Sequence, residues 1–242
     1  MKSIYFKELK QFFASPIGYL SMGMFFLLSA LFLWVIEGAY YLPSYRFADL
    51  NPFFDLAPWI LIFVIAALSM KSFSEEFKTG TIENLLTKPL TQKNIVIGKF
   101  LAIWSLGLIM LLPTLIYVYT VQSLSMEGSL DYKNLLSAYI GLILLIGNFA
   151  AIGIFSSVLF NNQVNAFLLG LFLMFFLFYG LQGISSFNLL GNLDLFFQKL
   201  SLNEPYQNMV KGLLKLSDII YMLSIIILFI FLSIKVLQKR IQ

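Results

Sequence analysis

The chain has 242 residues and a formal net charge of +4; 60% of its residues are hydrophobic and 12% are charged, against about 25% charged in soluble proteins. A globular domain of a few hundred residues buries only about 70–75% of its unfolded surface, so this composition excludes an ordinary soluble enzyme and favours a polytopic membrane protein. Cys and His are both absent, which excludes disulfides, thiolate nucleophiles and imidazole bases, and disfavours haem and zinc chemistry.

The first thirteen residues predict an amphipathic helix that lies in the membrane interface. Apolar residues recur three to four positions apart, and Lys, Glu and Gln fill the positions between them. The apolar face consists of Ile4, Tyr5, Leu9, Phe12 and Phe13. Ser15-Pro16 ends the helix, because a proline disfavours helical backbone in the residue before it. The helix is either an anchor or a lever that joins the membrane unit to a moving cytoplasmic partner.

Six apolar stretches are each long enough to cross a bilayer, which takes about 20 residues. They run over residues 17–36, 53–70, 100–121, 135–159, 166–183 and 219–234. Backbone in lipid must satisfy its own hydrogen bonds, so we expect helices. The first stretch has no small-residue cleavage site and is interpreted as an uncleaved start-transfer helix. The expected fold is an all-α integral membrane protein with one domain over residues 1–242.

The positive residues predict the orientation of the six spans. Eleven fall before span one, between spans two and three, and after span six: Lys2, Lys7, Lys10, Lys71, Lys78, Lys88, Lys93, Lys99, Lys235, Lys239 and Arg240. Five fall on the other side: Arg46, Lys133, Lys199, Lys211 and Lys215. Cytoplasmic loops carry the excess of Lys and Arg, so both termini are expected in the cytoplasm.

The spans themselves carry almost no ionisable side chain. Glu37, Asp55, Asp218 and Lys235 all fall at span ends. Ion-coupled transporters place such groups at mid-membrane depth, which argues against a secondary transporter. The stretch from Gly80 to Lys88 lacks the second glycine and the Lys-Ser/Thr pair of a phosphate loop. If ATP drives this protein, another chain must bind it.

Small and polar residues inside the spans predict helix packing. Gly147 and Ala151, Gly153 and Ser157, and Ala166 and Gly170 are each four residues apart. This spacing lets helices approach closely, either within one subunit or at a seam between subunits. Asn148 is expected to form a hydrogen bond between helices, and a contact with substrate is the alternative.

The segment between spans two and three has a specific pattern. Ser72 and Glu75 have the spacing of a capping box, and Gly80 should end the helix that follows. Thr81 can then cap a short helix over Ile82–Thr87, which Lys88-Pro89 stops. Ile82, Leu85 and Leu86 form one apolar stripe on it. The stripe suits a groove on a soluble partner, although it could instead pack on the protein's own interfacial surface. Thr91 can cap a further helix that leads into span three.

The region between spans five and six, residues 184–218, is rich in Leu and Phe. Loops in water are rarely so apolar, so we expect interfacial or re-entrant helices on the extracytoplasmic face.

Several motifs together resemble the type-2 ABC exporter permeases. The main one comprises Glu76, Gly80, Thr81, Glu83, Leu85, Leu86 and Pro89, with Ile82 inside it. The resemblance implies that this segment is the coupling helix, which docks into an ATPase subunit. Gly98-Lys99-Phe100 and the run from Phe13 through Ser15-Pro16 to Gly18-Tyr19 also fit the family.

A third motif lies before the last span. Lys211-Gly212, Asp218 and Tyr221 are similar to a family pattern of Arg-Gly, Asp and Tyr, with Lys in place of Arg. The His-Phe pair common upstream is absent, and Pro205-Tyr206 stands near its place. In the family, helices between spans five and six close the outer end of the path. The resemblance therefore implies an outer gate of Phe196, Phe197, Gly212, Asp218 and Tyr221. A passive interfacial cap and a docking surface for a periplasmic partner are the alternatives.

The nearest resemblance is to gliding-motility-associated permease subunits of the GldF type, and the permeases of nitrous-oxide-reductase maturation share much of the pattern. It implies a bacterial inner-membrane protein without catalytic residues, metal or cofactor of its own. Two copies of a separate ATPase would bind ATP and Mg. A second permease, identical or related, and membrane lipids are the other implied partners; a subunit with a large extracytoplasmic domain is possible, and nucleic acid is not expected. The alternative functions are a membrane scaffold of a motility or secretion assembly that moves no substrate, and a permease for another substrate, such as in nitrous-oxide-reductase maturation.

Overall fold

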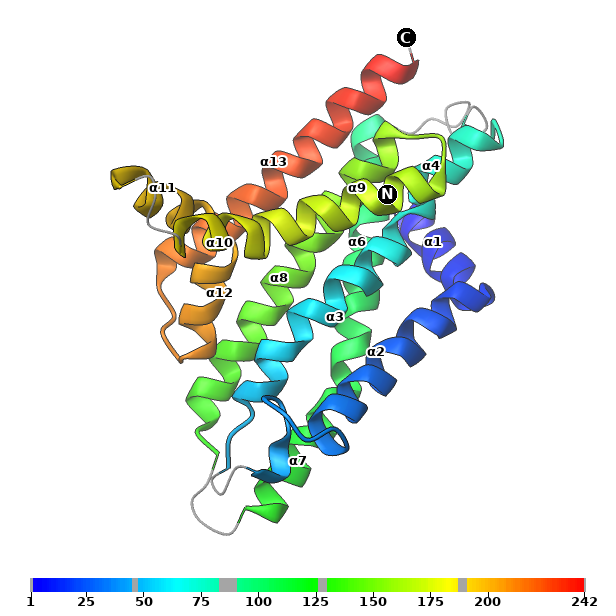
Figure 1. Cartoon of the computed structure of the whole chain (residues 1–242). Helices are drawn as coiled ribbons and strands as arrows, with labels where there is room; N and C mark the ends of the chain where they lie inside the picture. The colour runs from blue at the N-terminus through cyan, green and yellow to red at the C-terminus, as the bar shows by residue number, and fades with distance from the viewer. Residues whose placement is uncertain (1, 45–47, 83–90, 126–129, 187–190, 242) are drawn as a thin grey trace.

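The computed structural model describes residues 2–44, 48–82, 91–125, 130–186 and 191–241, and these residues form helices joined by short connections (Figure 1). No strand occurs among the residues described. The predicted all-α fold is confirmed.

Six helical segments are long and apolar enough to cross a membrane. The first, fourth and last are the single helices α2 (Pro16–Trp34), α8 (Tyr132–Leu159) and α13 (Leu216–Ile241). The second joins α3 (Asn51–Ser69) to α4 (Lys71–Lys78), and the third joins α6 (Gln92–Leu111) through η2 (Leu112–Thr114) to α7 (Leu115–Leu124). The fifth joins α9 (Gln163–Phe175) through the π-helical turn η3 (Phe176–Gly180) to α10 (Leu181–Ser186).

A helical segment that is long and apolar enough to cross a membrane occurs at each of the six predicted spans. Five of these segments are longer than the apolar run, whereas α2 ends at Trp34, two residues before the predicted end at residue 36. Span three was expected from residue 100, whereas α6 begins at Gln92, where Thr91 Oγ1 accepts a hydrogen bond from Asn94 N. Span six was expected over 219–234, whereas α13 continues to Ile241. Polar residues end an apolar run without ending a helix, so composition marks the part of each helix that suits lipid and not the whole helix.

The remaining elements lie at the ends of the bundle. The predicted amphipathic helix is α1 (Lys2–Ala14), and Ser15 caps the next helix by accepting from Ile17 N. A short turn, η1 (Leu42–Ser44), precedes α3. The expected helices between spans five and six are α11 (Asn192–Leu200) and α12 (Asn203–Val210).

Three helices form the centre of the bundle. In α3, α6 and α8, 61–78% of the apolar window is buried, against 22–28% in α2, α9 and α13. Small residues bring the central helices together: a Cβ added at Gly153 would lie 2.6 Å from the Ser69 Cβ, and one at Gly107 would lie 2.4 Å from Ile146 Cγ2. Of the two alternatives for the small-residue pattern, packing within one subunit is therefore observed for Gly153.

The prediction for Asn148 is wrong. This side chain is fully buried on α8, and its Nδ2 donates to the Leu144 carbonyl of the same helix at 2.9 Å. The amide donor is satisfied on the preceding turn, and Asn148 forms no hydrogen bond to another helix among the residues that the structure describes.

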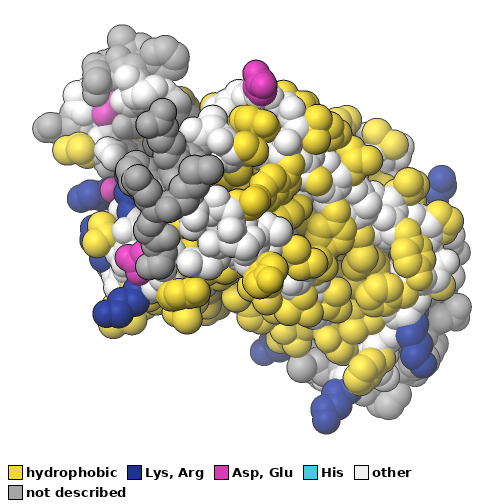
Figure 2. Space-filling model, turned by 90° about the horizontal axis from the view of Figure 1, so that it is seen from below, with side chains coloured by type: hydrophobic (Ala, Val, Ile, Leu, Met, Phe, Trp, Pro, Cys, Tyr) yellow, Lys and Arg dark blue, Asp and Glu magenta, His cyan; other side chains and the backbone are white. Residues whose placement is uncertain are grey.

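The bundle has two chemically different ends. One end holds α1, α4, the turn between α8 and α9 and the last turns of α13, and we call it the terminal end (Figure 1). The far end holds the end of α7, the start of α8 and α12. Seen from below, a broad surface of hydrophobic side chains has Lys and Arg at its margins, as expected of a surface that faces lipid (Figure 2).

Candidate functional site

The terminal end is organised around the break between α3 and α4. The backbone N–H groups of Phe73 and Ser74 bond to Ser157 Oγ of α8, at 2.9 and 3.2 Å. The same hydroxyl donates to the Met70 carbonyl at 3.0 Å. One serine therefore satisfies the backbone at the break and fixes α4 on α8. The predicted capping box is wrong, because α4 begins at Lys71 and Ser72 lies inside it.

Lys99 is the centre of the site. It lies in the second turn of α6 and is only 1% exposed. Its Nζ is 2.7 Å from Glu8 Oε1 on α1 and 3.0 Å from Glu76 Oε2 on α4. The same nitrogen donates to the Ser72 carbonyl at 2.6 Å and lies 4.8 Å from the centre of the Phe73 ring.

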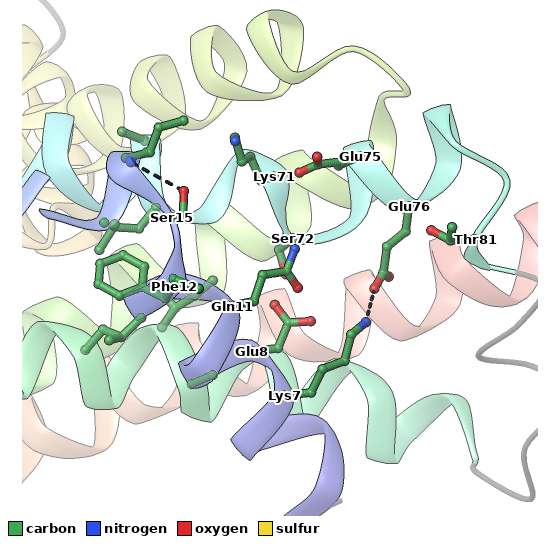
Figure 3. Close-up of a pocket in the computed structure, with 18 of the residues that line it drawn as sticks. Lys7, Glu8, Gln11, Phe12, Ser15, Lys71, Ser72, Glu75, Glu76 and Thr81 are labelled. Carbon is green, nitrogen blue, oxygen red and sulfur yellow. Dashed lines mark hydrogen bonds and ion pairs between the residues drawn. The ribbon is translucent and has the colours of Figure 1, made fainter. Parts of the chain in front are cut away.

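Glu76 extends the cluster to a second lysine. Its Oε1 is 3.0 Å from Lys7 Nζ on α1 (Figure 3). Two carboxylates thus balance two ammonium groups, and the members come from α1, α4 and α6. We call Lys7, Glu8, Glu76 and Lys99 the ion cluster. A buried charge is tolerated only when it is paired and hydrogen-bonded, so Lys99 keeps both of its carboxylate partners only while these three helices keep their positions.

A groove with a volume of about 600 Å³ adjoins the ion cluster (Figure 3). Its polar rim comes from α1 and α4 and includes Lys7, Glu8, Lys71, Glu75 and Glu76. Its apolar wall comes from the spans and includes Ile17, Ala67, Leu68, Ala102, Ile103 and Leu106. The groove therefore has a charged side and an apolar side.

The structure describes part of the predicted coupling segment. Glu76 is buried in the ion cluster, and Gly80 ends α4 with φ of +69°, as its predicted role as a helix breaker requires. The Thr81 hydroxyl is exposed and lies 2.9 Å from the Thr79 hydroxyl, and Ile82 is buried. Glu83, Leu85, Leu86 and Pro89 lie outside the described residues.

The predicted lever residues line one side of α1. Ile4 is buried, Leu9 and Phe12 are half-buried, and Phe13 is 39% exposed. A tight corner joins α1 to α2, where a Cβ at Gly18 would lie 2.5 Å from the Phe12 carbonyl oxygen. Sequence reasoning missed Lys7 and Glu8, which fix α1 from its polar side. The available signal for these partners was Lys99, which is spaced four residues from Ile95 and from Ile103. A cation on an apolar helix face needs carboxylate partners from other segments, and Ile95 and Ile103 are indeed buried.

The predicted gate residues are separated into two groups. Phe196 of α11 is 58% exposed, and its ring contacts that of Phe197. Asp218 accepts from Asn208 Nδ2 at 2.8 Å, and the Tyr221 hydroxyl donates to the Leu200 carbonyl. Gly212 has φ of +80° in the turn between α12 and α13. Asp218 and Tyr221 therefore connect α13 to α12 and to the end of α11.

Tyr206 of α12 is the residue at the far end that sequence reasoning missed. It is fully buried, and its hydroxyl donates to the Phe54 carbonyl of α3 at 2.7 Å. That carbonyl lacks its usual helical partner, because the residue four positions on is Pro58, which has no N–H. Burial raises the pKa of Tyr206 well above its usual value, so the hydroxyl stays a donor. Pro58 was the available signal.

The linker before α12 likewise donates hydrogen bonds to backbone carbonyls, here those of η3. Leu202 N donates to the Leu177 carbonyl, and Ser201 Oγ donates to the Phe178 carbonyl, both at 2.9 Å. π-Helical turns displace carbonyls from regular helical bonding and occur often at functional sites. Together with Tyr206, these bonds fix α12 across α3 and η3.

Comparison with known protein families identifies the family of this chain. The family described as ABC-2 family transporter protein matches residues 2–240. The chain belongs to this family. It is therefore a multi-pass ABC-2 permease, the membrane transport component that works with an ABC ATPase subunit. A comparison with curated proteins finds no match. In this ABC-2 permease the terminal end holds the ion cluster and leads directly into residues 79–82.

Proposed function

We propose that this ABC-2 permease is the membrane subunit of a type-2 exporter in the bacterial inner membrane, with both termini in the cytoplasm. Two copies of a separate ATPase chain bind ATP and Mg and hydrolyse the ATP. This chain, paired with an identical or related permease, turns that hydrolysis into export or mechanical work. A gliding-motility or secretion machine is the proposed setting, in which a subunit with a large extracytoplasmic domain is a further partner.

The ion cluster is the observation that carries this proposal. The segment expected to receive force from the ATPase begins directly after α4, and Glu76 of α4 is paired with Lys7 of α1 and Lys99 of α6. A displacement of α4 is therefore transmitted to the interfacial helix and to span three at once. Moving α1 or α4 alone would break one of the two ion pairs of the buried Lys99. Moving α6 alone would break both and leave Glu8 and Glu76 without that partner, at a cost of about 3–5 kcal/mol. Helices linked in this way move as one body.

The far end supplies the proposed outer gate. Opening requires α12 to leave the Phe54 carbonyl and the two η3 carbonyls, each of which then needs water or another donor. Phe196 is exposed on α11 and is free to meet a substrate or a second permease copy. The hydrogen bonds of Asp218 and Tyr221 connect α12 and the end of α11 to α13, and we expect them to form again when the gate closes.

The docking assignment is tested with Glu83→Lys combined with Leu85→Asp. The purified permease is reconstituted with its ATPase, and both co-purification and transport-linked ATP hydrolysis are measured. We expect at least a tenfold loss of both, with membrane insertion unchanged. Glu37→Lys makes the same charge reversal at an exposed residue of the far end and should leave both readouts intact. Unchanged co-purification and ATP hydrolysis in the double variant would show that the ATPase does not dock on this segment.

A second measurement separates an exporter from a scaffold. If the permease moves a substrate, extracts or candidate substrates added to the reconstituted complex should raise its rate of ATP hydrolysis. A scaffold binds the ATPase with no such stimulation under any substrate. A partner pull-down from native membranes tests the motility or secretion setting directly, because the extracytoplasmic subunit should be recovered with the ATPase.

A further inference from the structure

The groove beside the ion cluster is also lined by charged and apolar residues that take no part in the ion pairs between the helices. We propose that it binds the headgroup and glycerol region of a zwitterionic bilayer phospholipid, with the upper part of an acyl chain against its apolar wall. This assignment does not depend on which substrate the permease moves or on the ATPase.

The order of polarity in the groove is that of one bilayer leaflet. The rim is formed by charged residues of α1 and α4, and the wall continues along spans two and three. From Ala102 to Leu106 the wall extends about 6 Å, at 1.5 Å per residue of helix. From Lys71 to Ala67 it extends about 6 Å in the same direction. A ligand that fills this space must be charged at one end and apolar at the other.

The size of the groove also fits part of a lipid. Its volume is about 600 Å³, within the range of roughly 300–1,000 Å³ for small-molecule sites. Ala67 and Ile17 both line the groove and are half-buried, so the apolar part is reachable. A headgroup, glycerol and first methylene groups fill such a space, while the rest of the acyl chains continue into the bilayer.

The charges at the rim favour a dipolar headgroup. Lys7, Glu8, Glu76 and Lys99 satisfy one another in the ion cluster. Lys71 and Glu75 are half-buried at successive turns of α4, and neither forms an ion pair within the part of the chain that the structure describes. Figure 3 shows both on the side of the groove opposite Lys7 and Glu8. Lys71 suits a phosphate, and Glu75 suits an ammonium group.

The net charge of the site argues against an anionic lipid. The rim and the buried Lys99 together contribute three ammonium groups and three carboxylates: Lys7, Lys71 and Lys99 against Glu8, Glu75 and Glu76. A neutral site gains nothing from excess negative charge, and Glu75 would repel it. A headgroup that carries phosphate and ammonium together matches both unpaired side chains.

The test uses the full chain in nanodiscs that contain a photoactivatable phosphatidylethanolamine with a diazirine close to the glycerol. After illumination, crosslinked peptides are identified by mass spectrometry. We expect labelling of the peptides that contain Ile17 and Ile103–Leu106. Lys71→Gln and Glu75→Gln should each reduce it at least threefold, and Ala67→Phe, which fills the groove, at least fivefold.

Matched controls make the result specific. Lys78→Gln removes an exposed lysine from the same helix and should leave labelling unchanged. Monodisperse elution and an unchanged melting temperature show that each variant is folded. A phosphatidylglycerol probe should label the same peptides at least threefold less.

Three outcomes would overturn the proposal. Labelling that is equal in all variants would mean that ordinary surface lipid is detected. Equal labelling by phosphatidylglycerol would contradict the dipolar site. Complete loss of labelling when the ATPase is added would assign the groove to that partner. None of these outcomes affects the docking test on residues 83 and 85, which is read in a different complex.

Discussion

The two ends of the bundle join their helices through different kinds of buried polar contact. At the terminal end, three helices are joined by ion pairs around Lys99, which is 1% exposed. At the far end, the buried hydrogen bonds that join α12 and its preceding linker to α3 and η3 are uncharged and lie around Tyr206, which is fully buried; the bond from Gln207 Nε2 to the Asp55 carboxylate is exposed.

The difference predicts how each end responds when it is disturbed. Removing one member of a buried ion cluster leaves another charge uncompensated, so the terminal end fails as a unit. Removing one uncharged bond costs only the desolvation of its partner, so the far end weakens one bond at a time. An end that must transmit force gains from the first behaviour, and an end that must open and close gains from the second.

The largest effect is expected at Lys99. Lys99→Ala leaves Glu8 and Glu76 facing each other and should lower the free energy of unfolding by about 3–5 kcal/mol. Thermal unfolding in detergent micelles measures the loss. Lys93→Ala, at an exposed position one turn or more earlier on α6, is the control and should change little.

The same experiment has an internal check. Lys99→Met combined with Glu8→Gln and Glu76→Gln removes all three charges and should be more stable than Lys99→Ala alone. A triple variant that is less stable would mean that the cluster acts through packing and not through charge.

The next effect is expected at Tyr206. Tyr206→Phe leaves the buried Phe54 carbonyl without a donor and should cost about 1–3 kcal/mol. In a Pro58→Ala background the restored N–H can serve that carbonyl, so the same substitution should cost less than about 1 kcal/mol. A double-mutant cycle from melting curves gives the coupling. Tyr19→Phe on the exposed face of α2 serves as the neutral reference, and additivity of the two changes would exclude the proposed repair.

A smaller effect is expected at Ser157. Ser157→Ala leaves two buried N–H groups at the start of α4 without their acceptor and should cost about 1–2 kcal/mol. Ser156→Ala is a close control, because that hydroxyl donates to the Gly153 carbonyl of its own helix. Equal melting temperatures for the two variants would show that α4 does not depend on α8 at this point.

The smallest effect is expected at Arg240. Its guanidinium lies 3.8 Å from the centre of the Phe77 ring and donates to the Val158 carbonyl at 2.6 Å, but the side chain is exposed. Arg240→Gln should lower stability by about 0.5–1 kcal/mol. Lys239→Gln, on the next exposed position, should have no measurable effect in the same melting assay. A drop as large as that for Lys99→Ala would place Arg240 within the essential contacts of the terminal end.

The spans were predictable because the bilayer imposes a length and a composition that single residues reveal. Their ends were not, since α6 begins eight residues before the apolar run that starts at Phe100. The break at Gly80 was predictable from its backbone freedom, and Gly80 does end α4 with positive φ.

The contacts that give each end its character needed the fold. Lys99 counted among the loop cations in the sequence, and only the packing of α1 and α4 on α6 shows that it is buried. Tyr206 and Phe54 are too far apart in the chain for any local pattern to join them. The role of Glu83, Leu85, Leu86 and Pro89 in docking an ATPase stays a prediction.

The bond between Tyr206 and Phe54 joins residues that are 152 positions apart. During synthesis, α3 is made long before α12 exists, so its Phe54 carbonyl must wait without the Tyr206 donor. The last third of the chain therefore completes a helix that was inserted near the beginning. A nascent chain that stops before residue 206 should hold span two more loosely than the finished protein does, and its biogenesis has a late step that no single span reveals.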